Sequence, residues 1–136
     1  MACLDTTLIL DLRGRGGRKL QERARRKIKE LDLSGEALTT TIFNVAELWT
    51  GIERADDPAA EQGLVEEALG QIVVLGFDEA SARGFGRITA SLQERGRPAG
   101  DMDVLIASVA LLHRESIITR NPAHFGRIPG LTVESY

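Results

Sequence analysis

The chain has 136 residues, of which 43% are hydrophobic and 27% charged, and its formal net charge at pH 7 is −3. These values are typical of one average folded domain, and they exclude a disordered, collagenous or membrane-spanning chain. A chain of this length is too short for two independent cores, so we expect residues 1–136 to form a single domain.

The expected location is the cytoplasm, without attachment to a membrane. The longest apolar run, residues 104–112, is far shorter than the roughly 20 residues that cross a bilayer. The first residues lack the basic start and the cleavage site of a signal peptide. Cys3 is the only cysteine, so no disulfide can form within the chain, which suits a reducing compartment.

Short apolar runs alternate with helical segments along the chain. Strands are expected at residues 2–4, 37–41, 72–75, 116–119 and 131–133. Helices are expected at residues 6–12, 19–31, 43–54, 58–70, 78–96 and 102–114, with a short helical turn at 121–125. This alternation predicts an α/β fold in which helices cover both faces of a mostly parallel sheet of about five strands.

Local patterns refine two of these elements. Either Thr41 or Asn44 could cap the helix at 43–54, and Pro58 stands where the first turn of the next helix admits proline. The apolar run at 72–75 is typical of a strand that is buried on both faces.

Three acidic residues fall where such a sheet would place a site, because ligands gather beyond the carboxyl ends of parallel strands. Asp5 follows the first strand, Glu47 lies among apolar residues of a helix, and Asp103 directly precedes an apolar run. Helix capping is an alternative role for Asp5, Asp101 and Asp103. Two acids spaced by one residue exceed what a cap needs, so we expect Asp103 to point into a common site.

A hard divalent cation is the simplest remedy for repulsion if these carboxylates converge. Magnesium prefers carboxylate and water oxygens, and the chain has no thiolate cluster or histidine pair with the spacing of zinc ligands. The glycine-rich segment 13–17 lacks the P-loop pattern. His113 and His124 have no nucleophile motif nearby, and we expect them to be surface or packing residues.

A basic segment contrasts with the acidic remainder of the chain. Residues 13–29 contain nine lysines and arginines and one acid, Glu22. Such a segment is either a solvated helix face or a surface that binds phosphates. Aromatic residues make up only 4% of the chain, which disfavours a base-stacking platform for single strands.

Several separated motifs resemble those of one family. They are Leu4-Asp-Thr6, Asn44-Val-Ala-Glu-Leu48, Asp103-Val-Leu-Ile-Ala107, Ile118-Thr-Arg-Asn121 and Phe125-Gly-Arg-Ile-Pro-Gly-Leu131. In this order, from Leu4 nearly to the end of the chain, they resemble a PIN-domain ribonuclease of the VapC family, the toxins of type II toxin–antitoxin pairs. The resemblance implies a three-layer α/β/α PIN domain.

The resemblance also implies an endoribonuclease that depends on Mg²⁺ or Mn²⁺ and leaves 5′-phosphate and 3′-hydroxyl ends. Asp5 and Asp103 would be the principal metal ligands and Glu47 the third acid, with Asp101 as a supplementary ligand. Catalysis would be metal-assisted hydrolysis of a phosphodiester in single-stranded or loop RNA.

Supporting residues follow from the same resemblance. Thr6 and Asn121 would orient the acids or hold a water molecule. His124 departs from the family pattern, because the residue before Phe125 is commonly acidic, and the fourth carboxylate is therefore missing.

The expected partners are RNA, a VapB-type antitoxin and a second copy of the chain. Arg23, Arg25 and Arg26 are the candidate RNA-binding residues of the basic segment. Trp49, the only tryptophan, is the candidate anchor for the antitoxin or the second subunit, although burial in its own domain is the alternative.

Two other functions remain open at this stage. One is a PIN-like nuclease that works without an antitoxin, which an adjacent antitoxin gene would exclude. The other is a catalytically silent module that binds RNA or a protein, which the costly grouping of Asp5, Glu47 and Asp103 argues against.

Overall fold

Five short strands form one parallel sheet. In the computed structural model, which describes residues 1–136, they lie in the order β3-β2-β1-β4-β5. The strands are β1 (Ala2–Leu4), β2 (Leu38–Thr41), β3 (Val73–Leu75), β4 (Ser116–Ile118) and β5 (Val133–Glu134). Every neighbouring pair is parallel, and Ala2 of β1 aligns with Leu38 of β2 and Ser116 of β4.

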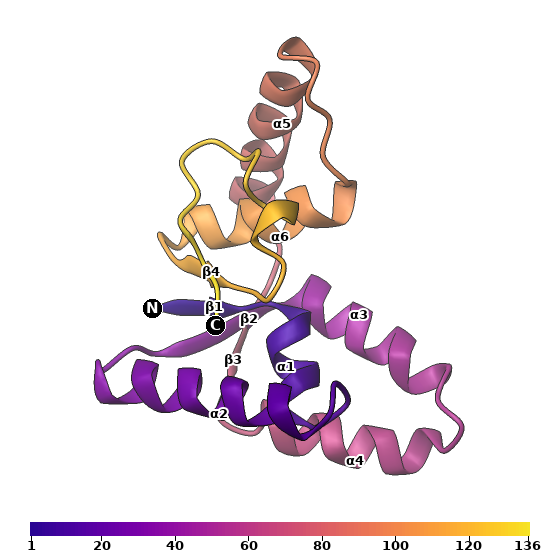
Figure 1. Cartoon of the computed structure of the whole chain (residues 1–136). Helices are drawn as coiled ribbons and strands as arrows, with labels where there is room; N and C mark the ends of the chain where they lie inside the picture. The colour runs from indigo at the N-terminus through magenta and orange to yellow at the C-terminus, as the bar shows by residue number, and fades with distance from the viewer.

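Helices cover both faces of this sheet (Figure 1). They are α1 (Thr6–Leu12), α2 (Arg18–Leu33), α3 (Ile42–Glu53), α4 (Pro58–Leu69), α5 (Glu79–Glu94), α6 (Asp101–Leu112) and the short 3₁₀ helix η1 (Pro122–His124). The helices α1, α2 and α4 lie on one side of the sheet, and α5 and α6 lie on the other (Figure 1). The predicted three-layer α/β/α fold is therefore confirmed.

The core is divided by the sheet into two clusters. Side chains alternate along β1, so Ala2 and Leu4 pack with α1 residues such as Leu8, while Cys3 packs on the opposite face with α6 residues such as Ile106. None of the helices combines the length and apolar character that a bilayer span requires.

The sequence at the helix starts explains where two helices begin. The Thr41 side chain accepts a hydrogen bond from the Asn44 backbone N–H, and the Asn44 side chain accepts one from the Thr41 backbone N–H. Both residues thus take part in one capping box. Asp57 caps α4 directly before Pro58, which occupies the first helical turn as predicted.

The strand β3 is an edge strand, and the prediction of a strand buried on both faces is wrong. Val73 is 59% exposed and Val74 is 43% exposed. The strand pairs only with β2, so one of its sides has no neighbouring strand. An apolar run predicts a strand, but it does not tell whether other elements cover it.

Candidate active site

Three neighbouring strands bring polar side chains to one edge of the sheet. Asp5 directly follows β1, Asn44 lies in the first turn of α3 after β2, and Thr119 directly follows β4. Since β1 lies between β2 and β4 and all three are parallel, their carboxyl ends meet. The candidate site is therefore centred on Asp5.

Asp5 is buried and held by side chains from three elements. Its Oδ1 accepts a hydrogen bond from Asn44 Nδ2 at 3.1 Å, and its Oδ2 accepts one from Thr119 Oγ1 at 2.7 Å. Thr7 Oγ1 lies 3.4 Å from the same Oδ2 and donates a weaker bond. These bonds fix the orientation of the carboxylate and offset part of the cost of burying its charge.

Glu47 reaches the site from α3. Its Oε1 accepts a hydrogen bond of 2.7 Å from Thr6 Oγ1, and Thr6 in turn accepts one from Asn44. Partial burial raises the pKa of the Glu47 carboxyl above its ordinary value, and the nearby charges of Asp5 and Asp103 raise it further, while the Thr6 bond opposes this shift. The three carboxylates therefore share one electrostatic environment.

Asp103 enters the site from the first turn of α6. Its Oδ2 lies 4.0 Å from Nδ1 of His124, the last residue of η1. Partial burial raises the pKa of Asp103 and the charge of Asp5 raises it too, whereas His124 lowers it. His124 is exposed, as expected for a surface residue, and it also borders the candidate site.

The donor chemistry suits Mg²⁺, but the carboxylates do not form a ready-made cage. Nowhere in the molecule are three or more His, Cys, Asp or Glu side chains grouped so that they could hold one ion. Asp5 and Glu47 accept hydrogen bonds from neighbouring side chains, and Asp103 lies beside His124. Mg²⁺ binds through one or two carboxylates and keeps several waters, so it does not need a full cage of protein ligands.

Two residues expected at the site lie at its margin. Asp101 is exposed at the start of α6 and borders a separate cavity with Thr89 and Leu92. The Asn121 side chain is exposed, and its backbone N–H donates a hydrogen bond of 3.1 Å to Thr119 Oγ1. Asn121 thus contacts the site through its backbone.

The three arginines proposed for RNA binding lie on α2, which packs beside α1. Arg23 donates a hydrogen bond to the carbonyl of Tyr136, and its guanidinium lies 5.9 Å from the centre of that ring. Arg25 lines a groove between α2 and α4, and Arg26 is exposed. None of them contacts Asp5, Glu47 or Asp103.

Asn44, Thr119 and Thr7 contact Asp5, although the sequence alone does not assign them to the site. The sequence predicts a helix-capping role for Asn44, yet its side chain is fully buried and its amide also donates a hydrogen bond to Asp5. For Thr119 the sequence predicts only the end of a strand, whereas its hydroxyl donates a hydrogen bond to Asp5. The position of each residue just beyond a parallel strand could have indicated its role, because these strand ends meet.

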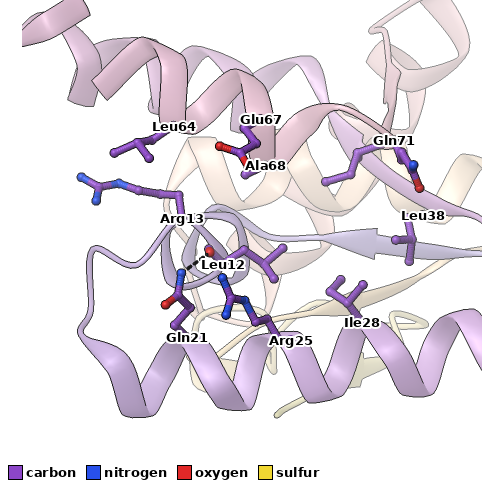
Figure 2. Close-up of a pocket in the computed structure, with 11 residues that line it drawn as sticks. Leu12, Arg13, Gln21, Arg25, Ile28, Leu38, Leu64, Glu67, Ala68 and Gln71 are labelled. Atoms are coloured by element: carbon purple, nitrogen blue, oxygen red, sulfur yellow. Dashed lines mark hydrogen bonds between the residues drawn. The ribbon is translucent and has the colours of Figure 1, made fainter. Parts of the chain in front are cut away.

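The largest cavity lies away from the carboxylates, between α2 and α4. It has a volume of about 460 Å³ and is lined by apolar side chains such as Leu12, Ile28 and Leu64, with Arg13, Arg25 and Glu67 at its border. Figure 2 shows these side chains around the space between the two helices. We call this cavity the α2–α4 groove.

Trp49 lies on α3 with 42% of its surface exposed, while Leu48 and Ile52 of the same helix are buried. Ile42 lies two helical turns before Trp49, on the same face of α3, and is 43% exposed. The helix therefore presents apolar surface that its own domain does not cover.

A family model for the PIN domain matches residues 2–131. The chain therefore belongs to the PIN-domain family. It is 36% identical over 108 residues to the tRNA(fMet)-specific endonuclease VapC of Shigella flexneri, which covers 79% of this chain and 82% of that protein. It is 27% identical over 133 residues to the ribonuclease VapC1 of Rickettsia felis, or 96% of this chain and 92% of that protein. Within the PIN family, the chain groups with the VapC ribonucleases.

Solved structures agree with this grouping. The DNA-bound VapBC complex of Salmonella typhimurium has a TM-score of 0.81 at 27% identity, covering 99% of this chain and 98% of that chain. VapBC2 of Rickettsia felis, bound to a DNA fragment from its promoter, has a TM-score of 0.88 over 99% and 98% of the two chains. The identity to the latter is 21%, so that likeness concerns the fold.

Proposed function

We propose that this protein is the toxin of a type II toxin–antitoxin pair, a magnesium- or manganese-dependent endoribonuclease that hydrolyses RNA phosphodiester bonds. The observation that carries this is the position of Asp5 at the carboxyl end of a parallel sheet in a PIN domain, where hydrogen bonds through Asn44 and Thr6 link it to Glu47. The charge of Asp103 acts on Glu47 from the first turn of α6. Neither Asp5 nor Glu47 pairs with a lysine or arginine, so their charge is available to a cation.

Asp5 and Asp103 would hold the ion, with Glu47 and Asp101 further out. When bound, the cation would act as a Lewis acid toward a phosphate oxygen and would lower the pKa of a water molecule. Asn44 and Thr119 prevent rotation of the Asp5 carboxylate. Glu47 is bonded to Thr6 through Oε1, which leaves Oε2 free to accept a proton from the attacking water.

The proposed protein partners are a VapB-type antitoxin and a second copy of the chain. Structures of related toxins with their antitoxins are among those that this chain resembles. The α2–α4 groove is mostly apolar with charged residues at its border, as expected for a surface that receives an amphipathic helix. The exposed side chains of Ile42 and Trp49 on α3 offer a second apolar surface for the other copy.

The function is tested by incubating total RNA with the purified protein, with Mg²⁺, with Mn²⁺ and with EDTA, and by mapping the cut ends. We expect cleavage only with a divalent cation, leaving 5′-phosphate and 3′-hydroxyl ends. An initiator tRNA is the first defined substrate to test, since the relative from Shigella flexneri is named a tRNA(fMet)-specific endonuclease.

Asp5→Asn serves as the matched inactive variant, because Asn keeps the size of the side chain and removes the charge. We expect it to fold and to leave RNA intact. Cleavage of equal rate by wild type and Asp5→Asn would show that a contaminating nuclease is responsible. Intact RNA under every condition, together with RNA binding, would favour the silent RNA-binding module instead.

A further inference from the structure

A second, smaller cavity adjoins the candidate site on the side of Asp103. It has a volume of about 320 Å³ and lies between residues 98–100, which precede α6, and η1. Asp103, Ala123, His124 and Arg127 also line it. We call this space the η1 cavity.

The η1 cavity is lined by side chains of opposite charge. Asp103 belongs to the group of carboxylates, whereas Arg127 contributes a guanidinium that remains charged at any relevant pH. One N–H of Arg127, on Nη1, donates a hydrogen bond of 3.0 Å to the Pro98 carbonyl. That bond anchors the guanidinium at the cavity while its other N–H groups remain free to bind an anion.

His124 adds a flat, accessible ring. Its side chain is 62% exposed although Nδ1 lies only 4.0 Å from Asp103. An exposed imidazole beside a guanidinium is suited to a splayed nucleotide, because the ring can stack on a base and the guanidinium can pair with a phosphate.

The proposed substrate needs such a contact close to the reaction centre. The negative charges of three carboxylates repel the phosphates of an RNA strand. The arginines of α2 do not contact this site, because Arg23 donates a hydrogen bond to the Tyr136 carbonyl and Arg25 lines the α2–α4 groove. The η1 cavity, in contrast, shares Asp103 with the site and supplies a positive charge through Arg127.

We propose that the η1 cavity binds the nucleotide next to the cleaved bond, with its phosphate on Arg127 and its base on the ring of His124. The proposal rests on the proposed ribonuclease function and extends it to how the strand is held. It gives this chain a substrate contact at His124, the position where the resemblance leads one to expect an acid.

The experiment uses a short RNA containing one mapped cleavage site. Each phosphate beside the cut is replaced in turn by an uncharged methylphosphonate, and kcat/KM is measured for wild type and Arg127→Gln. At one position we expect the methylphosphonate to lower kcat/KM of wild type by at least about ten-fold. The same replacement should lower kcat/KM of Arg127→Gln much less, because this variant has already lost the contact between Arg127 and the phosphate. Arg83→Gln on α5, an exposed arginine whose partner is Glu79, is the matched control.

The base contact is tested with His124→Phe and His124→Ala. We expect His124→Phe to keep KM near that of wild type, since it keeps a stacking ring, and His124→Ala to raise KM by roughly ten-fold. Arg127→Gln should also lower the slope of log affinity against log salt by about 0.7, the value for one phosphate contact on a single strand.

Different outcomes separate the two proposals. Suppose that wild type cleaves RNA, but that Arg127→Gln and each methylphosphonate lower kcat/KM by factors that simply multiply. The η1 cavity then does not bind the phosphate, and the nuclease function stands. If wild type leaves every RNA intact, the nuclease function fails. In that case an RNA affinity and salt slope unchanged by Arg127→Gln would also overturn the role of the cavity.

Discussion

The Asp5 carboxylate shows how single hydrogen bonds determine the candidate site. It is buried, and no lysine or arginine neutralises it, so its charge depends on donors from Asn44, Thr119 and Thr7. Hydrogen bonds to a charged group are stronger than those between neutral groups. The Thr119 bond of 2.7 Å is the shortest of the three. The orientation of Asp5 should therefore be sensitive to the hydroxyl of Thr119.

Thr119→Val is expected to lower RNA cleavage by at least about ten-fold, because it removes a bond to a charged group while preserving the shape of the side chain. It also leaves the Asn121 backbone N–H without its acceptor. Steady-state cleavage of a defined RNA measures the loss. Thr119→Ser keeps the hydroxyl and should retain most of the activity, and equal losses in both variants would contradict the orienting role.

The raised pKa of the Glu47 carboxyl makes the stability of the metal-free protein depend on pH. This pKa is higher in the folded protein than its ordinary value, so the folded state holds the proton more tightly than the unfolded state. The stabilisation from that proton is fully present below the ordinary pKa and is lost as pH rises through the folded pKa.

Glu47→Gln removes the carboxylate charge and with it the loss of stability at higher pH. It keeps an oxygen that can accept the hydrogen bond from Thr6. We expect the variant to match wild type at about pH 4, near the ordinary pKa of a glutamate, and to be the more stable protein at pH 7. Urea unfolding in EDTA at both pH values measures this. A difference that is independent of pH would contradict the sign derived above.

Helix α6 combines structural and functional roles along its length. Its first turn carries Asp103, and the next residues are almost continuously buried, including Ile106, Ala107 and Ala110. The buried part fixes the helix against Cys3 and Ile117 of the sheet, so it also fixes the position of Asp103.

Ile106→Ala is expected to lower the free energy of unfolding by about 2–5 kcal/mol, because it leaves a cavity in a packed core. Ile106 is 1% exposed, whereas Leu112 at the other end of α6 is 43% exposed. Leu112→Ala should therefore cost much less. Urea unfolding of the two variants compares them, and equal losses would show that α6 is packed differently.

The arrangement of elements could be predicted from the sequence where local pattern and packing agree. The turn residues and apolar runs predicted the five strands and the helices between them, and Pro58 indicated the start of α4. The pattern failed at β3, because Val73 and Val74 have the residue types of a buried strand but lie at the sheet edge. Exposure at an edge depends on strand order, which a local pattern does not contain.

The candidate site could be predicted as a group of acids but not as a network. Asp5, Glu47 and Asp103 are conspicuous because acids beside apolar runs need an explanation. Thr119 and Asn44 are ordinary polar residues whose role follows from the alignment of β2, β1 and β4. Their bonds to Asp5 join residues far apart in the chain, so only the folded structure reveals them.

Charge is distributed unevenly over the whole molecule. The net charge is −3, yet α2 carries most of the basic segment. A basic face away from the site can still attract RNA through its field, whereas a solvated face would have no such role.

Replacing Arg23, Arg25 and Arg26 by Ala tests the proposed attraction. We expect weaker RNA binding and a slope of log affinity against log salt that is lower by about 0.7 for each lost phosphate contact. Fluorescence anisotropy with a labelled single-stranded RNA at several salt concentrations measures both. An unchanged affinity and slope would identify the segment as a solvated face or a partner surface.

The molecule exposes two apolar surfaces, and they lie on different helices. The α2–α4 groove includes Leu64, which is 42% exposed, and the α3 surface includes Trp49, also 42% exposed. An antitoxin helix needs a groove into which its apolar side chains fit, while a second copy can bind an exposed helix face through a large aromatic anchor.

Substitutions on the two surfaces distinguish an antitoxin from a second copy of the chain. We expect Leu64→Arg to weaken antitoxin binding by more than ten-fold, since it introduces a charge into the groove, and to leave the oligomeric state unchanged. Trp49→Ala should instead shift a dimer toward monomer, or weaken the antitoxin complex if the antitoxin also reaches α3. Calorimetric titration with the antitoxin and light scattering of the free toxin measure these effects. Because each side chain is 42% exposed and neither belongs to the buried core, neither change should unfold the domain. Unchanged antitoxin affinity in Leu64→Arg would exclude the groove, and unchanged behaviour of Trp49→Ala in both measurements would exclude α3.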